Sequence, residues 1–303
     1  MARRFVAIGE CMIEMSGGAG GSWQLGYAGD TFNTAWYFRK ITDPGDWAVD
    51  YLTCLGDDSY SDGMAEFIAA AGIGTGHIRR LPGKRPGLYM IHQEDGDRRF
   101  TYWRDTAAAK CLADNPAALE AALGGADLAY LSGITVAILS DAARARLLAA
   151  VKASDATVAF DPNIRPHLWP HREAMRAGLM EAAEVADIVL PSFDDEAVTF
   201  GDASLEATAA RYKAREVAVK NAGAAVLVRE GEILEMVEPG PKVEALDATA
   251  AGDSFSAGYL AARLQGLAPG DAVRAAHDLA ALVVQHRGAL VPEDALPPKA
   301  AFR

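Results

Sequence analysis

Short apolar segments alternate with longer amphipathic segments along most of this chain, and few folds have such an order of elements. The short segments are rich in β-branched or apolar residues and have the length of buried strands. The predicted strands are Phe5–Gly9, Tyr51–Leu55, Leu128–Ser132, Thr157–Asp161, Ile188–Pro191, Val217–Lys220 and Val226–Arg229.

Segments with apolar residues at helical spacing lie between most of these strands. The predicted helices are Asp30–Lys40, Ser61–Ala71, Asp141–Ala153, Glu173–Ala186, Leu205–Lys213, Gly252–Leu264 and Asp271–His286. Strands that alternate with helices favour an α/β fold with a mainly parallel sheet, flanked by helices on both faces. Residues 1–303 are expected to form one such domain, because this length suffices for one large core.

One region breaks the alternation. Between Gly87 and Arg104, two apolar segments flank a turn at Glu94-Asp95-Gly96-Asp97, which predicts a β-hairpin without a following helix. Together with the glycine-rich stretch before Asp30, residues 12–28 and 86–106 are expected to form a small separate sheet that acts as a lid. The alternative is an antiparallel extension at the edge of the main sheet.

The composition limits the binding partners and the cellular compartment that we expect for this protein. With 41 acidic and 29 basic side chains the net charge is −12, which disfavours binding to the phosphate backbone of nucleic acid. No apolar stretch of about 18 residues predicts a membrane span. Cys11, Cys54 and Cys111 are odd in number and lack metal-ligand spacing, so we expect reduced thiols and a cytoplasmic protein.

Small residues lead directly into the predicted helix Gly252–Leu264, and a carboxylate stands at its start. The unpaired N–H groups of Ala250, Ala251 and Gly252 would face an anion there, with the helix dipole behind them. An acid beside an anion site is costly unless it has a role, such as accepting a proton. Asp253 is therefore a candidate general base. The alternative is that Asp253 is an ordinary helix cap.

Polar residues also open the predicted helix Asp30–Lys40. Gly29 permits close backbone contact, and the side chains of Asp30 and Asn33 can hydrogen-bond to hydroxyl groups. Taken alone, Asp and Asn at a helix start are more typical of ordinary caps.

Two arginines bear on the class of ligand. Arg104 ends the predicted hairpin, and Arg165 follows the predicted strand Thr157–Asp161, where α/β enzymes bind ligands. Two guanidinium groups that converge on one pocket would suit a carboxylate, each contributing roughly 1.5–3 kcal/mol. The alternative is that each arginine is a solvated surface residue.

Several of these segments, in this order, resemble the ribokinase-like (PfkB) carbohydrate kinases. The family writes Asp-Thr-Thr-Gly-Ala-Gly-Asp where this chain has Asp247-Ala-Thr-Ala-Ala-Gly-Asp253, so Ala248 and Ala250 are departures. The Ala-Ala-Gly-Asp form is similar to the 2-keto-3-deoxygluconate kinase branch. Further matches are Gly9-Glu10, Gly29-Asp30-x-x-Asn33, Asp161-Pro-Asn-Ile-Arg-Pro-His-Leu-Trp169, the segment His277–Ala289, and Asp294-Ala-Leu-Pro297.

The resemblance implies a fold, a reaction and cofactors. The fold is ribokinase-like, doubly wound, with a small β-sheet lid that closes over the sugar. The reaction transfers the γ-phosphate of ATP to the terminal hydroxymethyl of 2-keto-3-deoxygluconate by in-line transfer, with Mg²⁺, a possible monovalent cation and Asp253 as base. An exposed lid sheet also favours a homodimer through the lid.

The resemblance assigns roles to individual residues. Arg165 is expected to reach the transferring phosphate as well as the substrate, beside an anion hole formed by Ala250, Ala251 and Gly252. The expected substrate contacts are Gly29, Asp30, Asn33, Tyr89, Tyr102, Arg104, Arg165, Asp253 and Asp294.

The expected nucleotide and metal sites match the family less well. Relatives have Gly two places after Lys220, whereas here Ala222 precedes Gly223, and this loop is equally consistent with a simple turn. Phe193 occupies the place of a family Asn near the metal, so Glu196 is either a water-mediated Mg²⁺ contact, with Asp247, or an exposed helix acid. The expected nucleotide contacts are Asn163, Ser192, Lys220, Gly223, Ala250, Gly252 and His277.

Three rival functions remain at this point. A kinase of the same fold for a neutral sugar, such as fructose or ribose, or for a nucleoside would make Arg104 and Arg165 incidental. A nicotinamide dehydrogenase lacks support, since no Gly-x-Gly-x-x-Gly follows the first strand. A catalytically silent sugar-binding protein is disfavoured by Asp253.

Overall fold

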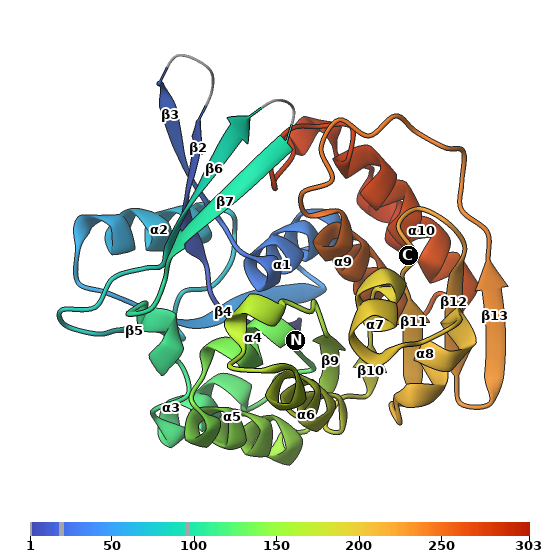
Figure 1. Ribbon diagram of the computed structural model, residues 1–303, viewed down its shortest axis with the longest axis horizontal. Helices are drawn as coiled ribbons and strands as arrows, with labels where there is room; N and C mark the ends of the chain where they lie inside the picture. Colours follow the sequence, from blue (N-terminus) through green and yellow to red (C-terminus); the bar gives the residue numbers. More distant parts are fainter. Residues whose placement is uncertain (1, 18–20, 95–96) are drawn as a thin grey trace.

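The computed structural model describes residues 2–17, 21–94 and 97–303, and in this part of the chain a nine-stranded sheet forms the centre of the molecule (Figure 1). Neighbouring strands from β5 to β11 are parallel, whereas β12 and β13 are antiparallel. In spatial order the strands are β13 (Ile233–Val237), β12 (Val226–Glu230), β11 (Glu216–Val219), β10 (Ile188–Val189), β9 (Thr157–Asp161), β8 (Leu128–Ser132), β1 (Arg3–Ile8), β4 (Trp47–Leu55) and β5 (Ile78–Arg80).

Helices cover both faces because successive strand residues point to opposite sides. On β1, Phe5 and Ala7 pack into one hydrophobic cluster, and Val6 and Ile8 pack into the other. The first cluster lies under α1 (Asp30–Ile41), α2 (Ser59–Ala70), α9 (Ala251–Leu264) and α10 (Pro269–Val283). The second lies under α3 (Pro116–Leu123), α4 (Gly133–Ile138), α5 (Asp141–Ala153), α6 (Arg172–Ala183), α7 (Phe193–Phe200) and α8 (Leu205–Arg211). The predicted fold class is therefore confirmed.

The described residues also form a separate four-stranded sheet, called the small sheet below. Its strands, in spatial order, are β3 (Trp23–Ala28), β2 (Met12–Gly17), β6 (Leu88–Glu94) and β7 (Asp97–Trp103). The pairing of β2 with β6 is parallel and the other two pairings are antiparallel. The alternative of an edge extension is thus wrong. Figure 1 shows the small sheet at the upper left, extending above α1 and α2. The centre of the predicted turn, Asp95-Gly96, lies outside the described residues.

The chain order of the sheet creates a site at one edge. From β1 the chain proceeds to β4 on one side, while β8 pairs with β1 on the other. Loops at the carboxyl ends of parallel strands diverge at such a switch point and leave room for a ligand. Among the described helices, none is both long and apolar enough to cross a membrane.

A buried carboxylate also joins the helix α9 to the strand β11 of the main sheet. Glu216 on β11 is buried, and its carboxylate accepts hydrogen bonds from Tyr259 at 2.6 Å and from Arg263 at 2.6 and 2.9 Å. Both partners lie on α9, so this cluster holds α9 against the sheet. A paired carboxylate of this kind avoids the large cost of an isolated buried charge.

Candidate active site

The N-terminus of α9 forms a tight backbone corner. Ala250 is the capping residue and adopts a left-handed conformation (φ 60°, ψ 14°), which usually favours glycine. Ala251 donates its N–H to the carbonyl of Ala248 at 3.2 Å, so this predicted anion donor is already engaged. The N–H groups of Gly252 and Asp253 follow in the first turn, where a helix leaves its donors unpaired. Gly252 is exposed, which lets an anion approach the backbone.

Asp253 is joined to α1 by a side-chain hydrogen bond. Asn33 donates its Nδ2 to Asp253 Oδ2 at 2.8 Å, and its Oδ1 accepts the N–H of Gly29 at 3.3 Å, which fixes the orientation of the amide. The pKa of Asp253 is raised to about 7, mainly by burial and then by the nearby charge of Asp30, while the Asn33 hydrogen bond and Lys220 act in the opposite direction. A carboxyl group with this pKa can accept a proton near neutral pH.

A chain of polar contacts runs from α1 to the loop after β11. Asp30 accepts a hydrogen bond from Asn163 Nδ2 at 2.7 Å, and Asn163 donates its N–H to Asp161 at 3.1 Å. Asn163 has φ 32°, a conformation that Asn tolerates better than most residues. Asp161 in turn accepts from Lys220 at 2.5 Å and from Ser256 at 3.0 Å.

Lys220 lies beside the N-terminus of α9. A Cβ atom built on Gly252 would be 3.6 Å from Lys220 Nζ, so the ammonium group borders the exposed backbone of the first turn. Ser192 forms an isolated β-bridge with Lys220, which brings the start of α7 to the same place. A cation and helix N–H groups in one corner are the combination that binds phosphate.

The predicted acid-binding residues gather under the small sheet. Tyr89 is paired with Tyr102 across β6 and β7, and Tyr89 donates its hydroxyl to Glu14. The ring of Tyr102 stacks on His167 of η2 (Pro166–Leu168), with centroids 5.7 Å apart. The charges of Arg104 and Arg165 both act on Tyr102 and His167, where they help to lower the pKa of the imidazole and oppose the burial that raises the pKa of the phenol. Both arginines therefore lie near enough to this aromatic pair for their charges to act on it.

Each arginine has an acidic neighbour that sequence reasoning missed. Arg104 Nη2 forms an ion pair with the buried Glu10, and Arg165 Nη1 lies 3.8 Å from Asp195 Oδ2 and donates to the carbonyl of Ile164 at 2.8 Å. The pKa of Asp195 is raised overall, mainly by burial, while the charge of Arg165 opposes the shift. The charges of Asp161 and Lys220 also act on this carboxyl group, so Asp195 lies near the polar contacts between Asp30 and Lys220.

The two acids predicted to contact Mg²⁺ both accept hydrogen bonds from other groups of the protein. The side chain of Glu196 is fully buried and accepts a hydrogen bond from Tyr212 at 2.6 Å, and burial raises its pKa to about 7. The carboxylate of Asp247 accepts the N–H groups of Thr249 at 2.9 Å and Gly288 at 2.7 Å. The alternative of an exposed helix acid is thus wrong for Glu196, and a water-mediated contact with Mg²⁺ stays a prediction for both residues. Within the described residues, no group of three or more His, Cys, Asp or Glu could hold a metal.

Three other predicted contacts lie outside the network. Asp294 is exposed in η3 (Glu293–Ala295), where the adjacent Glu293 pairs with Lys40 at the C-terminal end of α1, roughly 15 Å of helix away from Asp30. His277 on α10 is buried edge-on against Phe255. Gly223 (φ 82°) lies in the exposed turn after β11.

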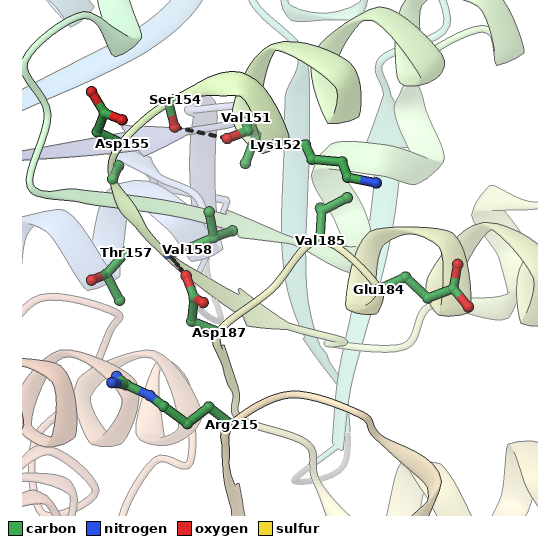
Figure 2. A pocket seen from close by; sticks show the side chains of 11 residues that line it. Val151, Lys152, Ser154, Asp155, Thr157, Val158, Glu184, Val185, Asp187 and Arg215 are labelled. Atoms are coloured by element: carbon green, nitrogen blue, oxygen red, sulfur yellow. Dashed lines mark hydrogen bonds between the residues drawn. The ribbon is translucent and has the colours of Figure 1, made fainter.

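A cavity of about 460 Å³ lies elsewhere, at the opposite edge of the sheet (Figure 2). Thr157, Asp187 and Arg215 line it and stand at the amino ends of β9, β10 and β11, whereas Asp161 and Lys220 stand at the carboxyl ends. Asp187 in this cavity accepts the N–H of Val158 at 2.8 Å, which satisfies one of its oxygens. This cavity is separate from the candidate site.

Known carbohydrate kinases are similar to this chain in sequence and in fold. The family model described as pfkB family carbohydrate kinase matches residues 2–296. A 2-dehydro-3-deoxygluconokinase of Escherichia coli strain K12 is 39% identical over 309 residues, covering 98% of this chain and 100% of the relative. The crystal structure of a 2-dehydro-3-deoxygluconokinase from Thermotoga maritima has a TM-score of 0.84 at 21% identity, covering 100% of this chain and 97% of that one. A fructokinase with bound ATP from Xylella fastidiosa has a TM-score of 0.82 at 22% identity, covering 100% and 97%. This chain belongs to the pfkB family of carbohydrate kinases.

Proposed function

We propose that this protein is a 2-dehydro-3-deoxygluconokinase, which transfers the γ-phosphate of ATP to the terminal hydroxymethyl of 2-keto-3-deoxygluconate. The observation that carries the proposal is the position of Asp253, whose carboxyl group is hydrogen-bonded to Asn33 beside the N-terminus of α9. The 39% identity to a relative of that name over nearly the whole chain supports the substrate.

The acceptor would bind between α1 and the small sheet. Asp30 and Asn33 open α1 and carry the groups that bind sugar hydroxyls, and a contact of the ligand with Gly29 stays a prediction. Arg104, Arg165 and the two tyrosines of the small sheet would bind the carboxylate end. A contact of the substrate with Asp294, whose neighbour Glu293 pairs with Lys40, stays a prediction.

The phosphates of ATP would lie in the corner formed by Lys220 and the first turn of α9. Lys220 is already held by Asp161 and Ser256, so its ammonium group is positioned before the nucleotide arrives. Ser192 and Asn163 border this corner, whereas contacts of the nucleotide with Gly223 and His277 stay predictions. A similar fold in a fructokinase with bound ATP supports the nucleotide.

Magnesium would be held mainly by the phosphates and by water, which suits a cation that keeps much of its hydration shell. Of the described carboxylates, Asp195 fits this role better than Glu196, because it stands between Arg165 and Lys220 at the corner. Bound Mg²⁺ would neutralise charge on the phosphates. Dependence on a monovalent cation stays a prediction.

Each residue of the site would have its own role in the transfer of the phosphoryl group. Asp253 accepts the proton of the attacking hydroxyl, the new O–P bond forms in line with the breaking bond to ADP, and Asp253 later releases the proton to solvent. The N–H groups of Gly252 and Asp253, together with Lys220, stabilise the negative charge of the transferring group. Asn33 keeps Asp253 turned toward the acceptor.

A second candidate is a kinase of this family that acts on a neutral sugar, since a fructokinase shares the fold. The surroundings of Arg104 and Arg165 favour the acid. Both cations act on the same aromatic pair, Tyr102 and His167, and a neutral sugar would leave their remaining N–H groups without a charged partner.

We also propose that residues 1–303 act as one domain in which the small sheet is a lid, and that two copies pair through this lid. One face of the small sheet carries Trp23, Leu25 and Trp103, which are 36%, 47% and 55% exposed. The strand register places Met15, Met90 and Thr101 in the same row as Leu25, and the two methionines are half-buried. Such a face marks an interaction site. The free thiols fit a cytoplasmic protein.

Replacing the proposed base should remove most of the turnover. Asp253→Asn is expected to lower kcat by about 10²- to 10⁴-fold, the usual contribution of a general base, while the affinity for ATP changes little. Steady-state kinetics and nucleotide titration measure the two quantities. Asp271→Asn, in the first turn of α10, is a matched control that should keep kcat. An unchanged kcat in Asp253→Asn would remove this residue from the mechanism.

The proposed substrate class predicts a preference that depends on two arginines. The wild-type kcat/KM for 2-keto-3-deoxygluconate should exceed that for fructose, and Arg104→Met or Arg165→Met should each reduce the value for the acid by about 10- to 150-fold. An ADP-release assay on both substrates measures this, with the exposed Arg274→Met as control. Equal wild-type values on the two substrates would contradict the acid assignment.

The proposed dimer predicts a response to charge on the small sheet. The protein should have the mass of a dimer by light scattering, and the double variant Leu25→Glu, Trp103→Glu should have the mass of a monomer, because buried unpaired charge opposes association. Ile233→Glu is the matched control, since Ile233 on β13 is 70% exposed but lies on the other sheet. A wild-type monomer, or a double variant that stays dimeric, would contradict this interface.

A further inference from the structure

Glu10 is a buried carboxylate at the point where the chain leaves the main sheet for the small sheet. It lies between the end of β1 and the start of β2, and its side chain is only 1% exposed. Its Oε2 pairs with Arg104, whereas its Oε1 is buried without a hydrogen-bond partner. Burial raises the pKa of Glu10, and the charge of Arg104 opposes this shift. A buried acid with one unsatisfied oxygen is costly, so its position calls for a role.

The other connections between the small sheet and the body meet at the same residue. Gly29, between β3 and α1, packs so closely that a Cβ atom there would overlap the carbonyl oxygen of Glu10. Gly87, before β6, packs against the side chain, and a Cβ atom there would lie 2.5 Å from Glu10 Oε1. Arg104 follows β7. Glu10 therefore contacts all three of the connections to which it does not itself belong.

The ion pair fixes the guanidinium of Arg104. A guanidinium is a planar fork with five N–H donors, so one bound carboxylate sets the plane in which the remaining donors point. Arg104 acts on Tyr102 and His167 from this position, which places it in the proposed carboxylate pocket. Without Glu10, the long side chain would have to be ordered by the substrate, at a cost in affinity.

We propose that Glu10 is a positioning residue that holds Arg104, and with it the small sheet, in the arrangement that selects a carboxylate-bearing sugar. The proposal rests on the proposed function, because it concerns substrate selection at the same site. Glu10 itself does not touch the reacting atoms. Glu10 acts on the substrate through Arg104, so its replacement should change KM for the acid rather than kcat.

The test is the conservative variant Glu10→Gln, which keeps the size and one acceptor but removes the charge. The KM for 2-keto-3-deoxygluconate should rise about 5- to 20-fold, with kcat within about twofold, and kcat/KM for fructose, however small, should stay the same. In the Arg104→Met background, Glu10→Gln should no longer change KM, because the two residues act as one unit. Equal losses on acid and fructose, or an undiminished effect in that background, would overturn the proposal.

The control separates this effect from loss of stability. Glu216→Gln removes another buried carboxylate that pairs with an arginine, but on the far side of the fold, so it should leave the acid-to-fructose ratio unchanged. Thermal unfolding of all variants verifies that each is folded under assay conditions. If the wild-type enzyme shows no preference for the acid, the proposed function fails. If it shows the preference and Glu10→Gln retains the wild-type KM, only the role of Glu10 fails.

Discussion

The site depends on one hydrogen bond between the starts of two helices. Asn33 and Asp253 are 220 residues apart in sequence, and their 2.8 Å contact joins α1 to α9 at the carboxyl edge of the sheet. Thr34 reinforces this junction by donating its hydroxyl to the carbonyl of Asp253 at 3.3 Å. The helix that begins with sugar-binding groups is thereby held against the helix whose first turn can bind phosphate. An acceptor hydroxyl and a phosphoryl group would meet where the two helices start.

Electrostatic balance explains why Asp253 suits a proton-accepting role. Asp30 and Asp161 surround it with negative charge, and its burial adds to their effect on its pKa. Lys220 offsets part of this charge but is itself paired with Asp161. The carboxyl group is therefore poised between its charged and neutral forms. Such a balance can be maintained at this half-buried position because nearby charges are screened less than in bulk water.

Much of the fold follows from local patterns. Apolar strands such as Leu128–Ser132 are buried along their whole length, so hydrophobicity marks them clearly. The strand β13 is also apolar except for Glu235, but Ile233, Leu234 and Met236 are exposed at the sheet edge, so it lacks the buried character of the central strands. The helix α7 has three acids in its first turn and spans only Phe193–Phe200, too short for a periodic pattern to stand out.

The site was less accessible to sequence reasoning, because it depends on direction and on distant partners. Adjacent residues on a helix point about 100° apart, so a motif match could not distinguish Asp195, which faces Arg165, from Glu196, which faces Tyr212. The spacing also could not reveal that Asp247 would accept the N–H of Gly288, 41 residues away. The ion pair of Glu10 with Arg104 likewise requires the small sheet to be folded.

The most direct test of the account is the dependence of kcat/KM on pH. Because the free enzyme's Asp253 must be deprotonated to act as base, and its pKa is raised to about 7, kcat/KM should rise about tenfold per pH unit below 7 and level off above it. A profile that is flat from about pH 5 to 8, or that rises toward acid, would contradict Asp253 as the base.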